Sequence, residues 1–450
     1  MGNRRYKVID RKVGLLGGTA LLVGTVIGIS VFLLPGQLIG EAGPSIVPAL
    51  AITAVPMLFG VLALLQLGGA MPVAGGVYVY ASRLISPLWG FMSVWLIIPA
   101  IWAVLLFTAL GFAEFARFFI DVPTPVLAAV VLAVFFLLNL AGTTIVTGVQ
   151  LAMVGFIALA ILAFVIPGAA AVDASNYTPM FPAGAEPFLI AVVALYVPFQ
   201  GFSMAIEIGE EVENPIKNIP RMLYLGMAVS VALSLGLVAV FAGLDDWEAL
   251  SAIDEGGVAQ AASSYLSGWI GPAVAIAAVL AAFTTLNAII TSYSRTLMRA
   301  ARDEVIHPKL AELHPRTQVP ALAVVVLALP PIALVPIAPD PILLAAFIAT
   351  VILFGGFLGA IALWNLPKRY PDRYRFAFYK LPMPVLKTSA IGTMIFAVLF
   401  WAALLPGAPQ IVLIVVALVL LGWLSYRRRV SGDRADDGLR ERMTRLADHE

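Results

Sequence analysis

Long apolar stretches separated by short polar segments dominate the pattern of this chain of 450 residues. A helix that crosses a bilayer needs about 20 apolar residues. Twelve stretches approach or exceed this length, at about 13–40, 45–67, 88–118, 124–142, 144–170, 186–211, 221–243, 268–300, 320–338, 341–365, 383–405 and 408–426. They are continuous, whereas the strands of a membrane barrel would alternate apolar and polar residues. The pattern predicts an all-α integral membrane protein with twelve transmembrane helices.

The basic residues assign an orientation to these helices. Of the 27 lysines and arginines, all but Arg117 fall in the N-terminal segment 1–12, in alternate loops and the stretch ends next to them, or in the tail 427–450. Segments on the cytoplasmic side of a membrane are enriched in positive charge. We therefore expect a multi-pass protein of the plasma (cell) membrane with a cytoplasmic N-terminus, a retained first helix and a cytoplasmic C-terminal tail.

The composition excludes several classes of protein. Hydrophobic residues make up 61% of the chain and charged residues 12%, too few to cover soluble domains of this total length. A net charge of +1 implies no nucleic-acid partner. The chain has no Cys, its three His fall in cytoplasmic segments, and no carboxylate pair lies at mid-membrane. An enzyme would need convergent nucleophiles, bases or metal ligands, so we expect neither an enzyme nor a cofactor other than a coupling ion.

Two of the predicted helices contain residues that interrupt helical geometry. Gly24 and Gly28 lie in the first stretch, and Pro198 and Gly201 lie in the sixth. Unwound backbone at mid-membrane is tolerated beside a cavity, where helix N-termini attract carboxylates and freed carbonyls attract cations. Breaks in the first and sixth stretches suggest a five-plus-five inverted repeat. The alternative is that these residues only kink the helices or let them pack closely.

Four motifs occur in the same order as in a known family. They are GTVIGISVFLLPG followed by AGP at 42–44, PVAGGVYVY through PLWGF at 72–91, GF at 201–202 followed by EEVENPIKNIPR at 210–221, and LNA, SR and ARD between 286 and 303. Together they resemble the amino acid–polyamine–organocation (APC) transporter superfamily. The resemblance implies a LeuT-like fold, that of the bacterial leucine transporter. Repeat one would then be 13–170 and repeat two 186–365, followed by two extra helices at 383–426.

The resemblance also implies a substrate site between the two breaks. The substrate carboxylate is expected near Ile27, Gly28, Ile29 and Ser30, and its amine near carbonyls of Thr25, Val26, Val197, Phe199, Gln200 and Gly201. Phe202 is expected either to close over the substrate or to pack the break. Many relatives have an acid where this chain has Ser203, which favours neutral amino acids.

The sequence does not decide which ion, if any, drives transport. Thr284 and Thr285, with carbonyls near Val26 and Ile27, could hold Na+, because hydroxyls and carbonyls suit a hard cation. The two hydroxyls could equally bond back to their own helix. Glu207 is a candidate for proton coupling, although it begins an acidic run at the predicted cytoplasmic exit of the helix.

Together, these sequence features and the resemblance predict a secondary active transporter, or permease, that moves amino acids by alternating access. An amine, polyamine or cationic amino acid exchanger is one alternative, and a transporter-like nutrient sensor without flux is another. The expected partners are a small-molecule substrate and the lipid bilayer.

Overall fold

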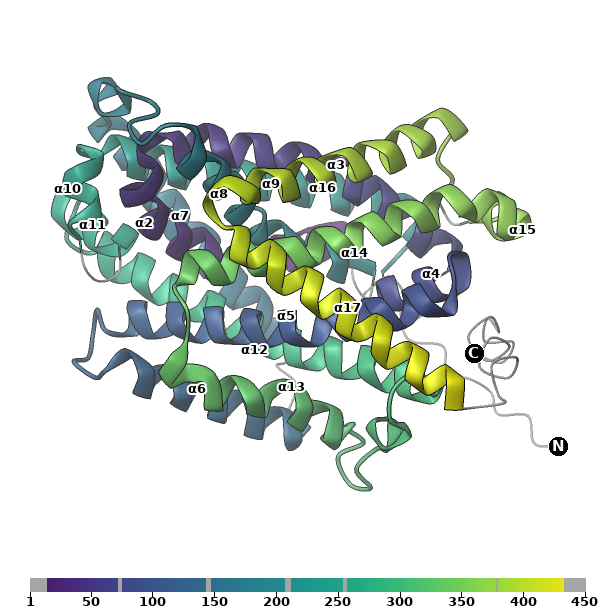
Figure 1. Cartoon of the computed structure of the whole chain (residues 1–450). Coiled ribbons are helices and arrows are strands. Elements are labelled where there is room, and N and C mark those ends of the chain that lie inside the picture. The colour runs from purple at the N-terminus through teal and green to yellow at the C-terminus, as the bar shows by residue number, and fades with distance from the viewer. Residues whose placement is uncertain are drawn as a thin grey trace.

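Helices make up the regular structure of the protein, as the computed structural model shows for residues 14–71, 75–142, 147–206, 212–253, 257–377 and 379–432. The long helices run side by side in one bundle, and short helices cover its two ends (Figure 1). Eight helical segments of the described residues are long and apolar enough to cross a membrane, and three further apolar helices have 10–17 residues. A multi-pass membrane protein follows from these segments, whereas twelve crossings and a LeuT-like arrangement stay predictions.

Each predicted stretch contains helix, but the ends differ from those expected. The first half of the chain forms α1 (Leu15–Val26), α2 (Ser30–Ala42), α3 (Ile46–Ala70), α5 (Pro87–Ala116), α6 (Thr124–Leu140) and α7 (Thr147–Ala171). The second half forms α8 (Ala185–Ala194), the 3-10 helix η3 (Val197–Ile206), α9 (Pro215–Gly243), α12 (Ile270–Arg302), α13 (Ala321–Leu334), α14 (Pro341–Arg369), α16 (Met383–Gly407) and α17 (Pro409–Gly432). Shorter helices lie between the long ones: α4 (Gly76–Leu84), α10 (Trp247–Ser251), α11 (Gly257–Tyr265) and α15 (Pro371–Arg375).

The outer faces of the bundle are apolar, as a lipid environment requires. Leu137 on α6, Ile395 on α16 and Leu413 on α17 expose 61%, 52% and 68% of their surface. Such side chains gain nothing by facing water, so these faces are suited to acyl chains. The interior is packed around α5 and α12, which cross the middle of the bundle next to each other (Figure 1).

A buried ion pair joins the C-terminal ends of two helices, α4 and α12. The Arg83 side chain, 1% exposed at the end of α4, places Nη2 2.7 Å from Oδ2 of Asp303, directly after α12. The Tyr78 hydroxyl donates to the same carboxylate at 2.6 Å, and Arg83 Nη1 donates to Ser82 Oγ at 2.6 Å. From α14, Asn365 Nδ2 donates to the Leu84 carbonyl at 3.0 Å. The cluster therefore ties α4 to the ends of α12 and α14.

Candidate functional site

The first break lies where the glycines of the first stretch predicted it. Helix α1 ends at Val26 and α2 begins at Ser30. The Ile27 N–H donates to the Val23 carbonyl at 2.8 Å, but the Gly28 N–H turns back to Val26 O at 2.9 Å. The N–H groups of Ile29 and Ser30 donate to no acceptor among the described residues. Unsatisfied N–H groups at a helix start have partial positive charge, so this end of α2 can accept an anion.

The second break begins after α8. Helix α8 ends at Ala194, and the chain continues as the 3-10 helix η3. Pro198 lies at the second position of η3, where its missing N–H prevents the α-helical ladder from continuing. The interruption expected from Pro198 and Gly201 is therefore present, and it takes the form of a tighter helix rather than an extended segment.

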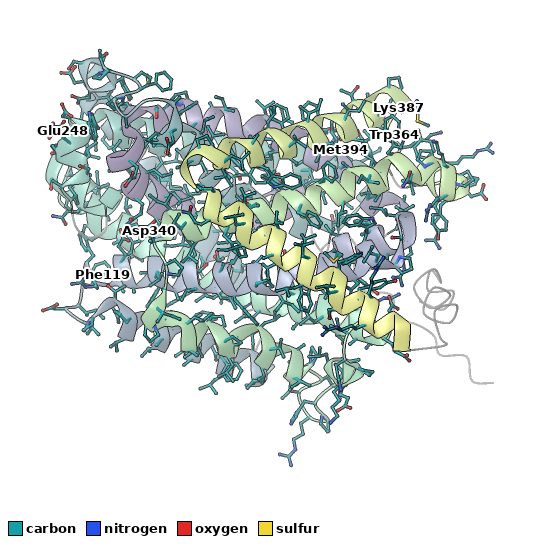
Figure 2. The ribbon with its side chains drawn as sticks, in the orientation of Figure 1. Phe119, Glu248, Asp340, Trp364, Lys387 and Met394 are labelled. Carbon is teal, nitrogen blue, oxygen red and sulfur yellow. The ribbon has the colours of Figure 1, made fainter. Side chains whose placement is uncertain are left out.

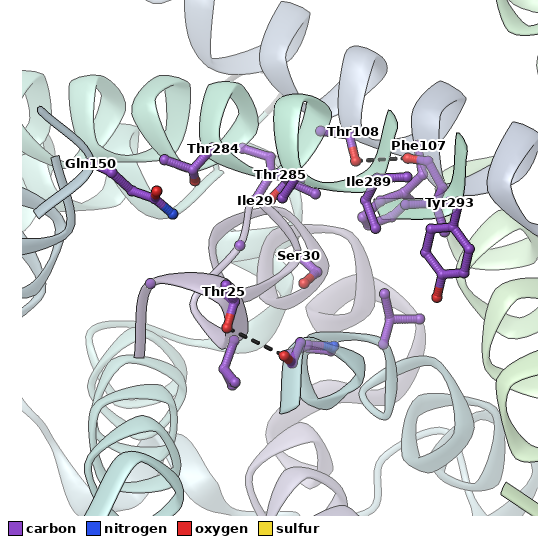
Figure 3. Close-up of a pocket in the computed structure, with 18 residues that line it drawn as sticks. Thr25, Ile29, Ser30, Phe107, Thr108, Gln150, Thr284, Thr285, Ile289 and Tyr293 are labelled. Atoms are coloured by element: carbon purple, nitrogen blue, oxygen red, sulfur yellow. Dashed lines mark hydrogen bonds between the residues drawn. The ribbon is translucent and has the colours of Figure 1, made fainter. Parts of the chain in front are cut away.

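The two breaks contact each other directly. Thr25 Oγ1 lies 2.8 Å from the Leu22 carbonyl and 3.3 Å from the Gly201 carbonyl, and the hydroxyl donates toward both (Figure 3). A Cβ atom on Gly201 would lie only 2.1 Å from the Thr25 carbonyl oxygen. Only glycine allows such an approach of two backbones. Gly201 thus sets the distance between the broken helices.

A cavity lies between the two breaks and helices α5, α7 and α12 (Figure 3). About 40 Å³ of it is open to the centres of water molecules, enough for a small polar group. Most of the residues predicted from the sequence line it: Thr25, Val26, Gly28, Ile29, Ser30, Val197, Gly201, Thr284 and Thr285. No residue in this lining is acidic or basic. The polar groups that face it are therefore hydroxyls, the Gln150 amide and backbone.

Other predicted residues lie elsewhere. Ile27 is 1% exposed and packs in the hydrophobic core without lining the cavity. Phe199 and Phe202 line a second, mainly apolar cavity of about 210 Å³. The side chains of Gln200 and Ser203, and the whole of Glu207, fall outside the described residues. The roles predicted for Phe202 and Glu207 therefore stay predictions.

Several lining residues were not found from the sequence. Phe107 and Thr108 reach the cavity from α5, and Ile289 and Tyr293 reach it from α12 (Figure 3). Tyr293 also lines the second cavity, so it stands where the two cavities adjoin. A hydroxyl within an apolar helix is the one sequence feature that could have identified Thr108 and Tyr293.

The hydroxyls considered for Na+ bond to their own helix. Thr284 Oγ1 and Thr285 Oγ1 donate to the Ala281 carbonyl at 2.9 and 2.8 Å. A Cβ on Gly28 would lie 3.0 Å from Thr285 Oγ1, so this hydroxyl abuts the first break. Donation to Ala281 occupies the protons of both hydroxyls and leaves oxygen lone pairs that a cation could use.

Comparison with known proteins places the chain among transporters. A family model described as amino acid permease matches residues 13–424. The branched-chain amino acid permease BcaP of Bacillus subtilis is 25% identical over 338 residues, which cover 70% of this chain and 72% of the relative. The human cystine/glutamate transporter is 30% identical over 340 residues (71% of this chain, 66% of the relative).

A third relative, the serine/threonine exchanger SteT of Bacillus subtilis, is 24% identical over 335 residues, which cover 71% of this chain and 76% of the relative. All three relatives are transporters by name, and none is an enzyme. This agrees with the absence of a catalytic constellation in the sequence and with the motifs that resemble the APC superfamily. The chain belongs to the amino acid permease family and is a membrane transporter, not an enzyme.

Proposed function

We propose that this protein moves neutral amino acids across the plasma membrane by alternating access, as a secondary active transporter. The observation that supports this most directly is the cavity at which the two broken helices meet, which no acidic or basic residue of the described part of the chain lines. Every amino acid has a carboxylate and an ammonium group, and both must leave water to enter the membrane interior. Their desolvation must be offset by polar groups of the protein.

The broken helices offer a polar group for each end of such a zwitterion. The N–H groups of Ile29 and Ser30, at the start of α2, suit the carboxylate. The carbonyls at the end of α1, around Thr25 and Val26, suit the ammonium group, because the C-terminus of a helix has partial negative charge. This pairing binds the common part of all amino acids and leaves the side chain to set specificity.

The lining favours a neutral side chain. A cationic side chain would need a carboxylate nearby, and an anionic one would need a lysine or arginine. Among the described residues neither lines the cavity, and the second cavity next to Tyr293 is lined mainly by apolar residues. Among the relatives, BcaP is named for branched-chain amino acids and SteT for serine and threonine. We therefore place neutral amino acids ahead of amines, polyamines and cationic amino acids.

Counterflow in liposomes tests the proposal. Purified protein is reconstituted into vesicles loaded with one unlabelled neutral amino acid, and entry of the same labelled amino acid is followed. We expect labelled leucine, valine, serine or threonine to accumulate transiently, and labelled arginine and putrescine to stay outside. Accumulation of arginine would overturn the neutral specificity. Binding of an amino acid in a thermal-shift assay without any counterflow would instead show a nutrient sensor.

For the coupling ion we propose Na+ held by Thr284 and Thr285 together with carbonyls near Val26 and Ile27. The contact of Thr285 with the first break supports this Na+ site, because a cation there would touch both α12 and the backbone around Gly28. Uptake is measured with Na+ replaced by choline at constant pH, and with a proton gradient imposed in either medium. Uptake that is unchanged in choline would remove the Na+ site and leave proton coupling or exchange.

A further inference from the structure

The connection between α14 and α16 has an excess of positive charge that the fold itself does not neutralise. Residues 368–387 contain six basic residues and a single acid, Asp372. The basic residues are Lys368, Arg369, Arg373, Arg375, Lys380 and Lys387. None of the six forms an ion pair with a carboxylate in the part of the chain that the structure describes. Their charge is therefore available to a partner outside the protein.

This connection is held in place by hydrogen bonds and by apolar packing. The Leu381 N–H donates to Oε1 of Gln66, a fully buried side chain of α3, at 2.7 Å. The Tyr374 hydroxyl donates to the Leu381 carbonyl at 2.8 Å. Tyr370 and Tyr374 pack against a buried cluster that includes Leu381. The cations thus stand on an anchored surface and not on a free loop.

Aromatic rings position three of the cations. Lys387 Nζ lies 5.5 Å from the centre of the Trp364 ring, and Lys380 Nζ lies 5.2 Å from that of Tyr374. The Arg375 guanidinium lies 5.7 Å from the ring of Phe376, which is 76% exposed. Figure 2 shows Lys387 beside Trp364, at the end of the bundle where α15 lies. Aromatic and basic side chains gathered in this way are typical of the level of lipid headgroups.

An exposed apolar stripe begins directly at these cations. On α16, Lys387 is followed at helical spacing by Ile391, Ile395 and Val398, which are 45%, 52% and 52% exposed. Residues at i, i+4, i+8 and i+11 share one face of a helix. A molecule with an anionic head at Lys380 and Lys387 could therefore extend an apolar tail along α16.

We propose that this surface, formed by Arg375, Lys380, Lys387 and the α16 stripe, is a binding site for an anionic phospholipid of the leaflet on that side. The charge complements a phosphodiester headgroup, and the stripe complements an acyl chain. Neither feature serves the cavity between the broken helices, so the site is independent of the proposed transport function. By the distribution of basic residues, that leaflet is the cytoplasmic one.

The test measures lipid binding to the full-length protein in neutral detergent, through the midpoint of thermal unfolding. Short-chain phosphatidylglycerol, short-chain phosphatidylcholine and inorganic phosphate are added in separate titrations. A ligand that binds only the folded state raises the midpoint with its concentration. We expect phosphatidylglycerol to raise it clearly more than either of the other two probes. An equal effect of phosphatidylcholine would overturn the headgroup preference, and an equal effect of phosphate would show a site for free anions instead of lipid.

Two triple variants assign the effect to this surface. The site variant is Arg375→Gln, Lys380→Gln and Lys387→Gln, and the matched control is Arg302→Gln, Lys309→Gln and Arg316→Gln. All six side chains are exposed. The control residues come from the last residue of α12 and the connection that follows it, which also contains Glu304 and Glu312. Each cation near an anionic headgroup contributes on the order of a fivefold gain in affinity, so the site variant should bind phosphatidylglycerol at least about tenfold more weakly.

The control variant should bind phosphatidylglycerol like the unmodified protein, and so should the charge-preserving double variant Lys380→Arg with Lys387→Arg. If the control weakens binding as much as the site variant does, net charge alone attracts the lipid and the proposal is wrong. If the arginine variant loses binding, the positive charges at these two positions are not what holds the headgroup, and the proposal is equally wrong.

Discussion

Two buried regions of this protein handle polar groups in opposite ways. At the cavity between α1 and η3 the polar groups are backbone, hydroxyls and the Gln150 amide, and none of the described residues that line it is charged. At the end of α4, a fully charged pair, Arg83 and Asp303, is buried with a tyrosine hydroxyl as a third partner. In the first region the N–H groups of Ile29 and Ser30 have no acceptor among the described residues, whereas the second region pairs its charges within the protein.

The difference follows from what each region must do. A buried charge costs several kcal/mol unless it is paired, and a good pair then fixes the geometry of its neighbours. A buried ion pair is therefore suited to hold α4, α12 and α14 in a fixed arrangement. A substrate must bind and leave, so the proposed site needs some donors that are still free, such as the N–H groups of Ile29 and Ser30, and must not attract the substrate too strongly. Weak dipoles at helix ends meet both requirements.

The largest expected effect on stability comes from breaking the ion pair between Arg83 and Asp303. Asp303→Ala leaves the Arg83 guanidinium buried without its carboxylate, which should cost about 3–5 kcal/mol of folding stability. Thermal unfolding of the purified variant measures this, with Asp372→Ala, an exposed acid of α15, as the control. Replacing both partners by apolar residues (Arg83→Met with Asp303→Leu) should recover part of the loss. If Asp303→Ala were as stable as Asp372→Ala, the ion pair between Arg83 and Asp303 would not stabilise the fold as described.

The next effect belongs to the contact between the breaks. Gly201→Ala forces the Thr25 carbonyl away from a Cβ that would otherwise lie 2.1 Å from it. Displacement of reacting or binding groups by about 1 Å can cost on the order of a hundredfold, and we expect a similar fall in counterflow rate. The matched control is Gly155→Ala on α7, where a Cβ meets no atom within 4 Å. Equal rates for the two variants would show that the contact does not matter for transport.

A smaller effect is expected at Tyr78. Tyr78→Phe removes the hydroxyl that donates to the Asp303 carboxylate but keeps the ion pair, so the loss should be about 1.5–3 kcal/mol. Burial, and next the Asp303 carboxylate, hold the pKa of Tyr78 well above its usual value. The hydroxyl therefore stays protonated, and the difference in stability should be constant below the ordinary tyrosine pKa of about 10 and shrink above it. A difference that varies through neutral pH would contradict this.

The smallest effect concerns the proposed cation. Thr285→Val removes one oxygen beside the first break and should weaken Na+ affinity by on the order of 1 kcal/mol, a several-fold rise in the half-saturating Na+ concentration. Thr350→Val is the matched control, because that buried hydroxyl donates to its own helix at Ala346 but lies outside the cavity. If both variants keep the same Na+ dependence, Thr285 is not a ligand.

Much of the fold could be predicted because it depends on local sequence. Apolar stretches near the length of a membrane crossing form helices wherever they occur, since an unpaired backbone group in hydrocarbon is costly. Gly24, Gly28 and Pro198 act on their own helices, so the two breaks could also be located. Helix α4 was not predicted, because a helix of 9 residues is too short to form an apolar stretch of membrane-crossing length.

The candidate site was found only in part. Residues at the breaks could be named because the breaks themselves expose backbone. Phe107, Thr108, Ile289 and Tyr293 reach the cavity from uninterrupted helices, and nothing in their local sequence says which face turns inward. Phe202 lies beside Gly201 in the chain but lines the second cavity, because successive residues of a helix point in different directions.

The sequence by itself determined that the chain is a membrane protein, where its helices lie and where two of them break. These properties follow from hydrophobic length and backbone chemistry. The tertiary structure decided which helices meet. The contact of Thr25 with Gly201 joins residues 176 positions apart, and the pair of Arg83 with Asp303 joins residues 220 positions apart. Such distant contacts depend on how all the helices pack together, which no single segment specifies.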